Sequence, residues 1–255
     1  MKAFCIQHDI VWENKAATHE KVRSLLRGAN VPSGSLIVLA EMFSTGFSMD
    51  VTAIAEREAK ESERFLAELA RARSCFVLGG VVTSGAGKGR NETVVYNPAG
   101  SEIARYCKMH PFTLGGELDN YERGREPVIF QWGDCTVAPF ICYDLRFPEA
   151  FRACIKMGVQ LYTVIASWPV ARIEHWVTLL KARAIENQAY VIGVNRVGTD
   201  PKFTYTGRSM IIAPSGEVLV DAGVEETVVG AEIDLGFLTQ YREQLPFLGD
   251  MWFSG

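Results

Sequence analysis

The sequence of 255 residues has no long uninterrupted hydrophobic stretch. A membrane-spanning helix needs about 20 consecutive apolar residues, and the apolar runs here fall far short of that length. In residues 1–9, polar side chains interrupt the apolar stretch at once, so a signal-peptide core is not expected. We therefore expect a cytoplasmic protein with no membrane partner.

Basic residues are not in surplus. There are 26 Lys and Arg residues against 30 Asp and Glu residues, which gives a formal net charge of −4. A nucleic-acid-binding surface needs clustered positive charge to neutralise phosphates, so this balance argues against a nucleic-acid partner.

Histidine and closely spaced cysteines are also scarce. The chain has four His and six Cys, and no two cysteines form a Cys-x-x-Cys pair, so a zinc site is hard to assemble. A disulfide framework is typical of short secreted chains, and this chain does not have that character. Most of the cysteines are expected to be buried apolar side chains, with one or two left for chemistry. No metal ion is expected.

Signatures of other enzyme classes are missing or misplaced. No Gly-x-Ser-x-Gly motif is present, which weighs against a serine hydrolase of the α/β type. The glycine-rich residues 85–89 are followed by strand-like residues rather than by a helix, so they predict a hairpin loop and not a phosphate-binding loop. His110 and His175 are each able in principle to partner a cysteine, but nothing in the sequence pairs either of them with Cys142.

Strand-like and helix-like segments alternate along the whole chain. Residues 55–73 have apolar side chains at helical spacing, and the β-branched residues 75–83 follow them. No repeat or linker interrupts the pattern, which indicates one α/β domain over residues 1–255. Strand–helix alternation predicts parallel pairs and the hairpins predict antiparallel ones, so we expect mixed sheets.

The C-terminal residues 237–255 are aromatic-rich and read as irregular structure. They are too apolar to lie free in water, so this tail is predicted to pack on the body of the domain or on a partner subunit. The aromatic residues concerned are Phe237, Tyr241, Phe247, Trp252 and Phe253.

Three strand-like stretches each lead into a residue whose side chain is able to take part in catalysis. The stretches are 36–40, 103–107 and 137–141, and the residues that follow them are Glu41, Lys108 and Cys142. Ligands of α/β folds bind beyond the carboxyl ends of strands, so these side chains are candidates for one pocket. Taken singly, each has an ordinary interpretation as a solvated carboxylate, a surface charge or a core thiol.

The three residue types suit nucleophilic catalysis. A carboxylate at Glu41 is able to accept the proton of the Cys142 thiol, because a thiol is a weak nucleophile until it is deprotonated. The ammonium group of Lys108 is able to stabilise a developing oxyanion. The backbone N–H of Tyr143, directly after the thiol, is a natural second donor.

The residues around these positions resemble the three catalytic blocks of the nitrilase (carbon–nitrogen hydrolase) superfamily. The blocks are residues 40–43, 106–112 and 141–149, in the order found in that family. The resemblance implies a four-layer αββα sandwich with two mixed sheets and a catalytic triad of Glu41, Lys108 and Cys142. It also implies that Glu117 is a second active-site glutamate, which positions Lys108, although Glu122 lies nearby in the sequence.

Within the superfamily, residues 167–169, 182–188 and 195–198 are most similar to omega-amidases. The resemblance implies an amidohydrolase that cleaves a small omega-amide of a dicarboxylate or keto acid, of the 2-oxoglutaramate or succinamate type. The products are the acid and ammonia, the intermediate is a thioester on Cys142, and no cofactor is needed. The alternatives are a nitrile or carbamoyl-amide hydrolase of the same fold, or a member that binds ligands without turnover.

The family layout also indicates the residues around the substrate. We expect the substrate to contact Phe43, Phe112, Ser167 and Trp168. Arg146 either pairs with Glu149 at a helix start or binds a substrate carboxylate. Arg183, Glu186 and Asn187 lie three or four residues apart and are predicted to serve packing or dimer formation. Relatives pair through helices, so a homodimer is expected.

Overall fold

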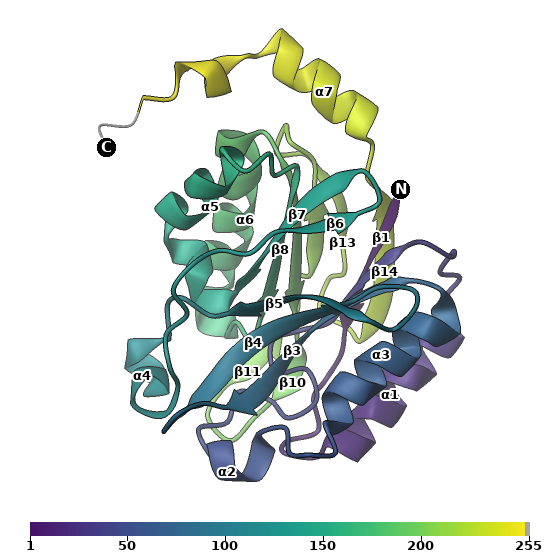
Figure 1. The fold of residues 1–255 in the computed structure, drawn as a ribbon, viewed down its shortest axis with the longest axis vertical. Coiled ribbons are helices and arrows are strands. Elements are labelled where there is room, and N and C mark those ends of the chain that lie inside the picture. Colours follow the sequence, from purple (N-terminus) through teal and green to yellow (C-terminus); the bar gives the residue numbers. More distant parts are fainter. Residues whose placement is uncertain (253–255) are drawn as a thin grey trace.

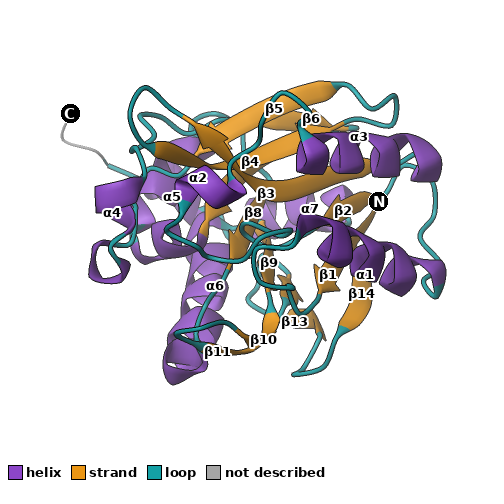
Figure 2. Ribbon diagram, turned by 90° about the horizontal axis from the view of Figure 1, so that it is seen from below, coloured by secondary structure: helices purple, strands orange, loops and turns teal. Residues whose placement is uncertain are grey.

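The computed structural model describes residues 1–252, so Phe253 of the predicted tail lies outside the described residues. Two six-stranded sheets pack face to face, and helices cover both outer faces (Figures 1 and 2). This is the four-layer αββα sandwich with two mixed sheets that the sequence predicted.

The first sheet has the strand order β14-β1-β2-β3-β4-β5. Its strands are β1 (Lys2–Gln7), β2 (Leu36–Val38), β3 (Phe76–Ser84), β4 (Gly89–Tyr96), β5 (Glu102–Cys107) and β14 (Thr227–Glu232). The central strands β1, β2 and β3 are parallel, and the remaining pairs are antiparallel. Residues 85–88 connect β3 to β4 as the predicted hairpin loop, closed by a 2.7 Å hydrogen bond from Gly85 N to Lys88 O.

The second sheet has the order β13-β12-β9-β8-β7-β6. Its strands are β6 (Phe130–Trp132), β7 (Cys135–Ile141), β8 (Leu161–Ala166), β9 (Tyr190–Asn195), β12 (Met210–Ile212) and β13 (Val218–Asp221). Here β7, β8 and β9 are the parallel strands. A short ribbon of β10 (Val197–Thr199) and β11 (Thr204–Thr206) leaves the end of β9.

Each main helix packs its apolar face against one of the sheets. Helices α1 (Lys15–Arg27) and α3 (Glu61–Arg73) cover the first sheet, and α5 (Pro148–Ile155) and α6 (Ile173–Asn187) cover the second. On α3 the buried residues recur at helical spacing, as the sequence predicted, and α5 begins with Pro at its first position. Each large apolar side chain buried in this way contributes about 1.5–3 kcal/mol.

Two four-residue helices, α2 (Val51–Ile54) and α4 (Glu117–Asn120), lie in the loops beside β3 and β5. Within residues 1–252, no helix is both long enough and apolar enough to cross a membrane.

The C-terminal segment begins with a helix rather than with irregular structure. Helix α7 spans Leu235–Gln244, and the side chain of Asp234 accepts a hydrogen bond from Phe237 N, which is a standard helix start. Leu238 is buried in the main core, and Arg242 donates to Val159 O at 2.9 Å. Further along, Phe247 and Trp252 keep 39% and 84% of their surface exposed. The tail therefore contacts the body at its helix, while large aromatic groups still face outward.

Candidate active site

Two tight turns at strand ends bring Glu41 and Cys142 toward the space between the sheets. Glu41 follows β2 and Cys142 follows β7, and both turns contain a non-glycine residue with positive φ, +45° at Met42 and +46° at Cys142. The neighbouring strand β3 passes the Glu41 turn closely. A Cβ atom on Gly80 would lie 2.8 Å from the Cα of Glu41, so only glycine fits there.

Glu41, Lys108 and Glu117 form one buried cluster. The Nζ of Lys108 donates to Glu41 Oε1 at 2.8 Å and to Glu117 at 3.0 Å (Oε1) and 2.8 Å (Oε2). All three side chains are excluded from solvent. The structure therefore brings together the predicted Glu41 and Lys108, and it places Glu117, rather than Glu122, on the ammonium group. Glu122 lies at the surface and pairs with Arg90.

Backbone and amide donors fix the two carboxylates. The Nδ2 of Asn91 donates to Glu41 Oε1 and to Glu117 Oε1, both at 2.8 Å, and the N–H of Ser167 donates to Glu41 Oε2 at 2.8 Å. The N–H of Phe112 donates to Glu117 Oε2 at 2.6 Å. Asn91 escaped the sequence analysis because its only signal is a polar residue at an inward position of β4.

The charges in this cluster stabilise one another. Burial alone lowers the pKa of Lys108, but the carboxylates of Glu117 and Glu41 outweigh it and hold that pKa well above its usual value. Burial raises the pKa of Glu117, and Lys108 opposes the rise. The ammonium group thus stays charged at any pH in the range where proteins are assayed.

Cys142 is a protonated thiol in this environment. Burial raises its pKa well above the ordinary value, the negative charge of Glu41 raises it further, and Lys108 opposes both. A neutral thiol is a poor nucleophile, so sulfur attack here requires a base that takes the proton during the reaction.

Asp144 braces the turn that carries Cys142. Its Oδ2 accepts from Ile141 N at 3.0 Å and from the hydroxyl of Tyr106 at 2.7 Å, and its Oδ1 accepts from His110 N at 3.0 Å. The ring Nδ1 of His110 lies 2.8 Å from the same Oδ1. Tyr106 and His110 flank Lys108 in sequence, so Asp144 ties the two strand ends together. The sequence analysis missed this role, because the partners meet only across the two sheets.

Replacing Asp144 by Asn should therefore lower kcat by about tenfold or more with a small change in KM. It should also lower the free energy of unfolding by about 1–3 kcal/mol, since an amide cannot accept all of these hydrogen bonds. Steady-state kinetics and urea unfolding test this. The exposed Asp134, in the turn between β6 and β7, gives the control variant Asp134→Asn. Wild-type kcat in Asp144→Asn would show that the brace does not position the thiol.

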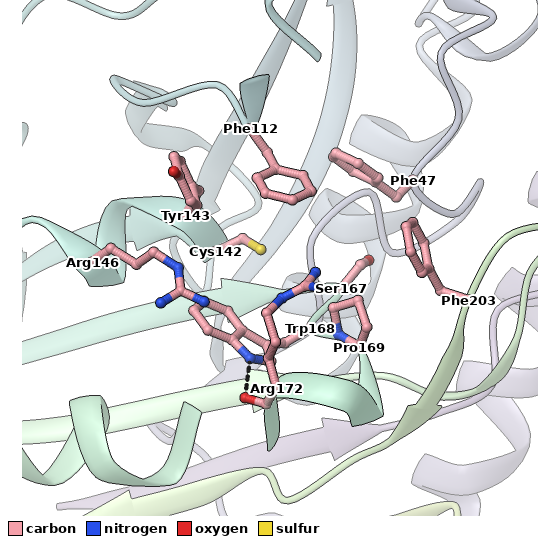
Figure 3. Close-up of a pocket in the computed structure, with 10 residues that line it drawn as sticks. All are labelled: Phe47, Phe112, Cys142, Tyr143, Arg146, Ser167, Trp168, Pro169, Arg172 and Phe203. Atoms are coloured by element: carbon pink, nitrogen blue, oxygen red, sulfur yellow. Dashed lines mark hydrogen bonds between the residues drawn. The ribbon is translucent and has the colours of Figure 1, made fainter. Parts of the chain in front are cut away.

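A pocket opens from solvent to Cys142 (Figure 3). Its volume is about 390 Å³ including the part open to solvent, at the small end of the range for ligand pockets. Five aromatic side chains line it, namely Phe47, Phe112, Tyr143, Trp168 and Phe203. Ser167 lies beside Cys142, and its buried hydroxyl has no partner within residues 1–252.

The predicted substrate-binding residues fall into two groups. Phe112, Arg146, Ser167 and Trp168 line the pocket together with Cys142 and Tyr143. Phe43 does not, because the chain turns at Met42 and the Phe43 ring ends on the outer face of the first sheet, stacked at 5.7 Å on Phe65. Phe47, four residues later, takes the place on the pocket wall that was expected of Phe43.

Of the two roles expected for Arg146, the ion pair with Glu149 is not formed within residues 1–252. Its guanidinium lies 4.7 Å from the ring centre of Trp168 on the pocket wall, and binding of a substrate carboxylate stays a prediction. A second pocket arginine, Arg172, was missed, although it follows the singled-out residues 167–169 closely. Tyr143 is the second residue of a 3₁₀ helix (Cys142–Arg146), whose first N–H groups are not used by the helix itself.

Helix α6 has the structural role predicted for it. Arg183 pairs with Glu186 at 2.8 Å and donates to Leu145 O at 2.6 Å, and Asn187 donates to Arg183 O at 2.9 Å. Within the described part of the chain, no group of three or more His, Cys, Asp or Glu side chains is arranged to hold a metal ion.

A thiol at a strand end, beside a buried carboxylate–ammonium–carboxylate cluster in an αββα sandwich, is the arrangement that nucleophilic hydrolysis by a thiol requires. The family model for carbon–nitrogen hydrolases matches residues 2–243, and the chain belongs to that family. The predicted family resemblance is confirmed.

Known relatives extend over almost the whole chain. The omega-amidase YafV of Yersinia enterocolitica is 37% identical over 98% of this chain and 96% of its own length. A 2-oxoglutaramate amidase of Bacillus subtilis is 32% identical over 97% and 96%, respectively. Among solved structures, a CN-hydrolase superfamily protein of Xanthomonas campestris, with an arsenic adduct in its active site, has a TM-score of 0.93. It is 30% identical, with 100% of this chain and 99% of that chain covered.

Proposed function

We propose that this protein is an omega-amidase, which hydrolyses the terminal amide of a small dicarboxylate or keto-acid monoamide of the 2-oxoglutaramate or succinamate type. The observation that carries this proposal is the buried Glu41–Lys108–Glu117 cluster next to the thiol of Cys142, in a small pocket. The names of the omega-amidase and 2-oxoglutaramate amidase relatives support the substrate class.

The first half of the proposed reaction forms a thioester. Glu41 accepts the Cys142 proton as sulfur attacks the amide carbon, because the raised pKa of the thiol leaves little thiolate in advance. Lys108 and the N–H of Tyr143 stabilise the oxyanion. Glu41 then returns the proton to the departing nitrogen, so that ammonia leaves and the acyl group stays on sulfur.

The second half hydrolyses the thioester. Glu41 accepts a proton from water as the water oxygen attacks the acyl carbon, and the intermediate collapses to release the acid. The proton returns from Glu41 to the sulfur, which restores the thiol. The net reaction consumes one amide and one water and yields one acid and one ammonia, with no cofactor.

Glu117 has a supporting role in this proposal. Both of its carboxylate oxygens accept from Lys108, and Oε2 also accepts from the N–H of Phe112 on the pocket wall. It therefore keeps the ammonium group charged and in place for the oxyanion while Glu41 exchanges protons.

The test is ammonia release from 2-oxoglutaramate and succinamate, with intact-protein mass spectrometry alongside. Ammonia release from both substrates is the expected result, with a transient acyl adduct on the protein that is succinyl for succinamate and 2-oxoglutaryl for 2-oxoglutaramate. Release only from carbamoyl amides or nitriles would replace the proposed substrate class. Absence of any acyl adduct with every amide tried would indicate a member of the fold that binds without turnover.

We further propose a cytoplasmic homodimer. All six cysteines are free thiols, which suits a reducing compartment. Large apolar side chains stay exposed just after α5, on α6 and in the C-terminal tail, namely Met157, Ile185, Phe247 and Trp252. Ile185→Glu on α6 should shift the protein from dimer to monomer in sedimentation velocity at micromolar concentration. A wild-type protein that is already monomeric there would contradict the dimer.

A further inference from the structure

Neither pocket arginine has a carboxylate partner within residues 1–252, but Arg146 has a polar neighbour in His175 and Arg172 has none. Within residues 1–252, the Arg172 guanidinium has no carboxylate partner and no hydrogen-bond acceptor. Two other buried arginines do have such partners, in the pairs Arg183–Glu186 at 2.8 Å and Arg196–Asp9 at 3.0 Å. Arg172 is half-buried among aromatic rings, so few water molecules are able to hydrogen-bond to its guanidinium in place of a protein partner.

The two guanidinium groups lie against different walls of the pocket, Arg172 against Phe112 and Arg146 against Trp168. The Arg172 guanidinium lies 5.5 Å from the ring centre of Phe112, which belongs to a separate segment on another wall. In Figure 3 the Arg172 side chain points toward the interior of the pocket, and the Arg146 guanidinium lies to one side, over Trp168. Both terminal nitrogens of Arg146 are also 3.4 Å from Nδ1 of His175, outside the pocket.

The backbone of Arg172 is held at a fixed place relative to the thiol cluster. The indole N–H of Trp168 donates to Arg172 O at 2.7 Å, and Arg172 N donates to Pro169 O at 3.1 Å. The same short segment begins at Ser167, whose N–H holds Glu41. The short segment that follows β8 (Leu161–Ala166) therefore does two things. It donates a hydrogen bond to Glu41, and it fixes the backbone from which the Arg172 side chain extends.

We propose that Arg172 is the residue that binds the free carboxylate of the substrate and so restricts the enzyme to amides with an acid group at the opposite end. A planar guanidinium accommodates a carboxylate through two parallel hydrogen bonds, and the aromatic walls shield that pair from water. This inference rests on the proposed omega-amidase function. It assigns the carboxylate to Arg172 rather than to Arg146, which was the candidate from the sequence.

The test compares succinamate with butyramide, in which a methyl group replaces the carboxylate. Arg172→Met should lower the succinamate-to-butyramide ratio of kcat/KM by roughly 30-fold or more, as expected when one partner of a shielded charge pair is removed. Most of the change should appear in KM. Arg172→Lys keeps the charge but loses the fork geometry, so its ratio should lie between those of wild type and Arg172→Met.

Arg146→Met is the matched comparison, because both arginines line the same pocket. It should leave the same ratio within about threefold, whatever it does to the absolute rates, since its guanidinium lies over Trp168 and toward His175. If Arg146→Met collapses the ratio, or if Arg172→Met slows both substrates alike, the assignment to Arg172 is overturned while amide hydrolysis stands.

A binding measurement separates this inference from the proposed function. Succinate, the expected product, should bind the wild-type protein in calorimetry and bind Arg172→Met at least tenfold more weakly, with circular dichroism confirming that the variant is folded. Equal succinate binding by both proteins would overturn the inference even if no amide is hydrolysed. Loss of succinate binding in Arg172→Met, with no turnover in wild type, would leave the carboxylate site in place and reject the omega-amidase activity.

Discussion

Replacing Cys142 by Ala should abolish amide hydrolysis, with kcat lower by about 10⁴-fold or more, because no covalent route remains. The variant should still fold, since the loss of one sulfur atom beside an open pocket leaves the packing of the core unchanged. Ammonia release measures the rate, and intact mass should show the acyl adduct in wild type only. The raised pKa of the Cys142 thiol predicts that alkylating reagents modify this group slowly at neutral pH.

The matched control is Cys107→Ala. Cys107 precedes Lys108 directly and is half-buried, and burial raises its pKa to about 12, so it is not a competing thiolate. Its replacement should leave turnover near the wild-type rate. Ordinary activity in Cys142→Ala would reject the thioester mechanism, and loss of activity in Cys107→Ala alone would move the nucleophile to that thiol.

Replacing Lys108 by Met should remove activity and also destabilise the protein by about 3–5 kcal/mol, because Glu41 and Glu117 then remain buried without their cation. For a chain of this size, the expected fall in Tm is roughly 2–4 °C for each kcal/mol. Thermal unfolding and steady-state kinetics give the two readouts. The exposed Lys2 gives the control variant Lys2→Met, which should unfold like wild type.

The pH dependence of Lys108→Met has a definite sign. Burial raises the pKa of Glu117 above the ordinary value of 4.5, and the loss of Lys108 removes the main opposing charge. A carboxyl group whose pKa is raised on folding binds a proton more tightly in the folded state, so the stability of the variant should fall as pH rises above about 4.5. A variant whose Tm rises from pH 5 to pH 8 would mean that the two carboxylates are not electrostatically held by this lysine.

Much of the site could be predicted from the sequence because its key residues follow buried strands. Glu41 and Lys108 are separated by 67 positions, yet their side chains meet at 2.8 Å. The short sequence blocks around these residues match a family pattern, and that match identifies the site where the spacing of the residues alone would not. Phe112 and Ser167 followed from the same blocks and line the pocket.

The rest could not be predicted, because it depends on tertiary contacts without a local pattern. Asn91 is one polar residue within a strand, and its role arises only where β4 faces the two glutamates. Phe203 reaches the pocket from the loop of the β10–β11 ribbon. Phe43 was placed on the substrate because the sequence does not reveal that the chain turns at Met42. The helix α7 went unpredicted although Asp234 is a suitable N-cap and Phe237 and Tyr241 are four residues apart, because the segment was interpreted by its aromatic content alone.

The left-handed backbone at Cys142 sets the protein's chemistry against its own stability. A non-glycine residue at φ +46° costs on the order of 1 kcal/mol, which glycine would not incur. Glycine at position 142 would relieve this strain, but it would also remove the thiol and lose more backbone entropy on folding. The corner that carries the proposed nucleophile is therefore one where the backbone conformation and the side chain favour different residues.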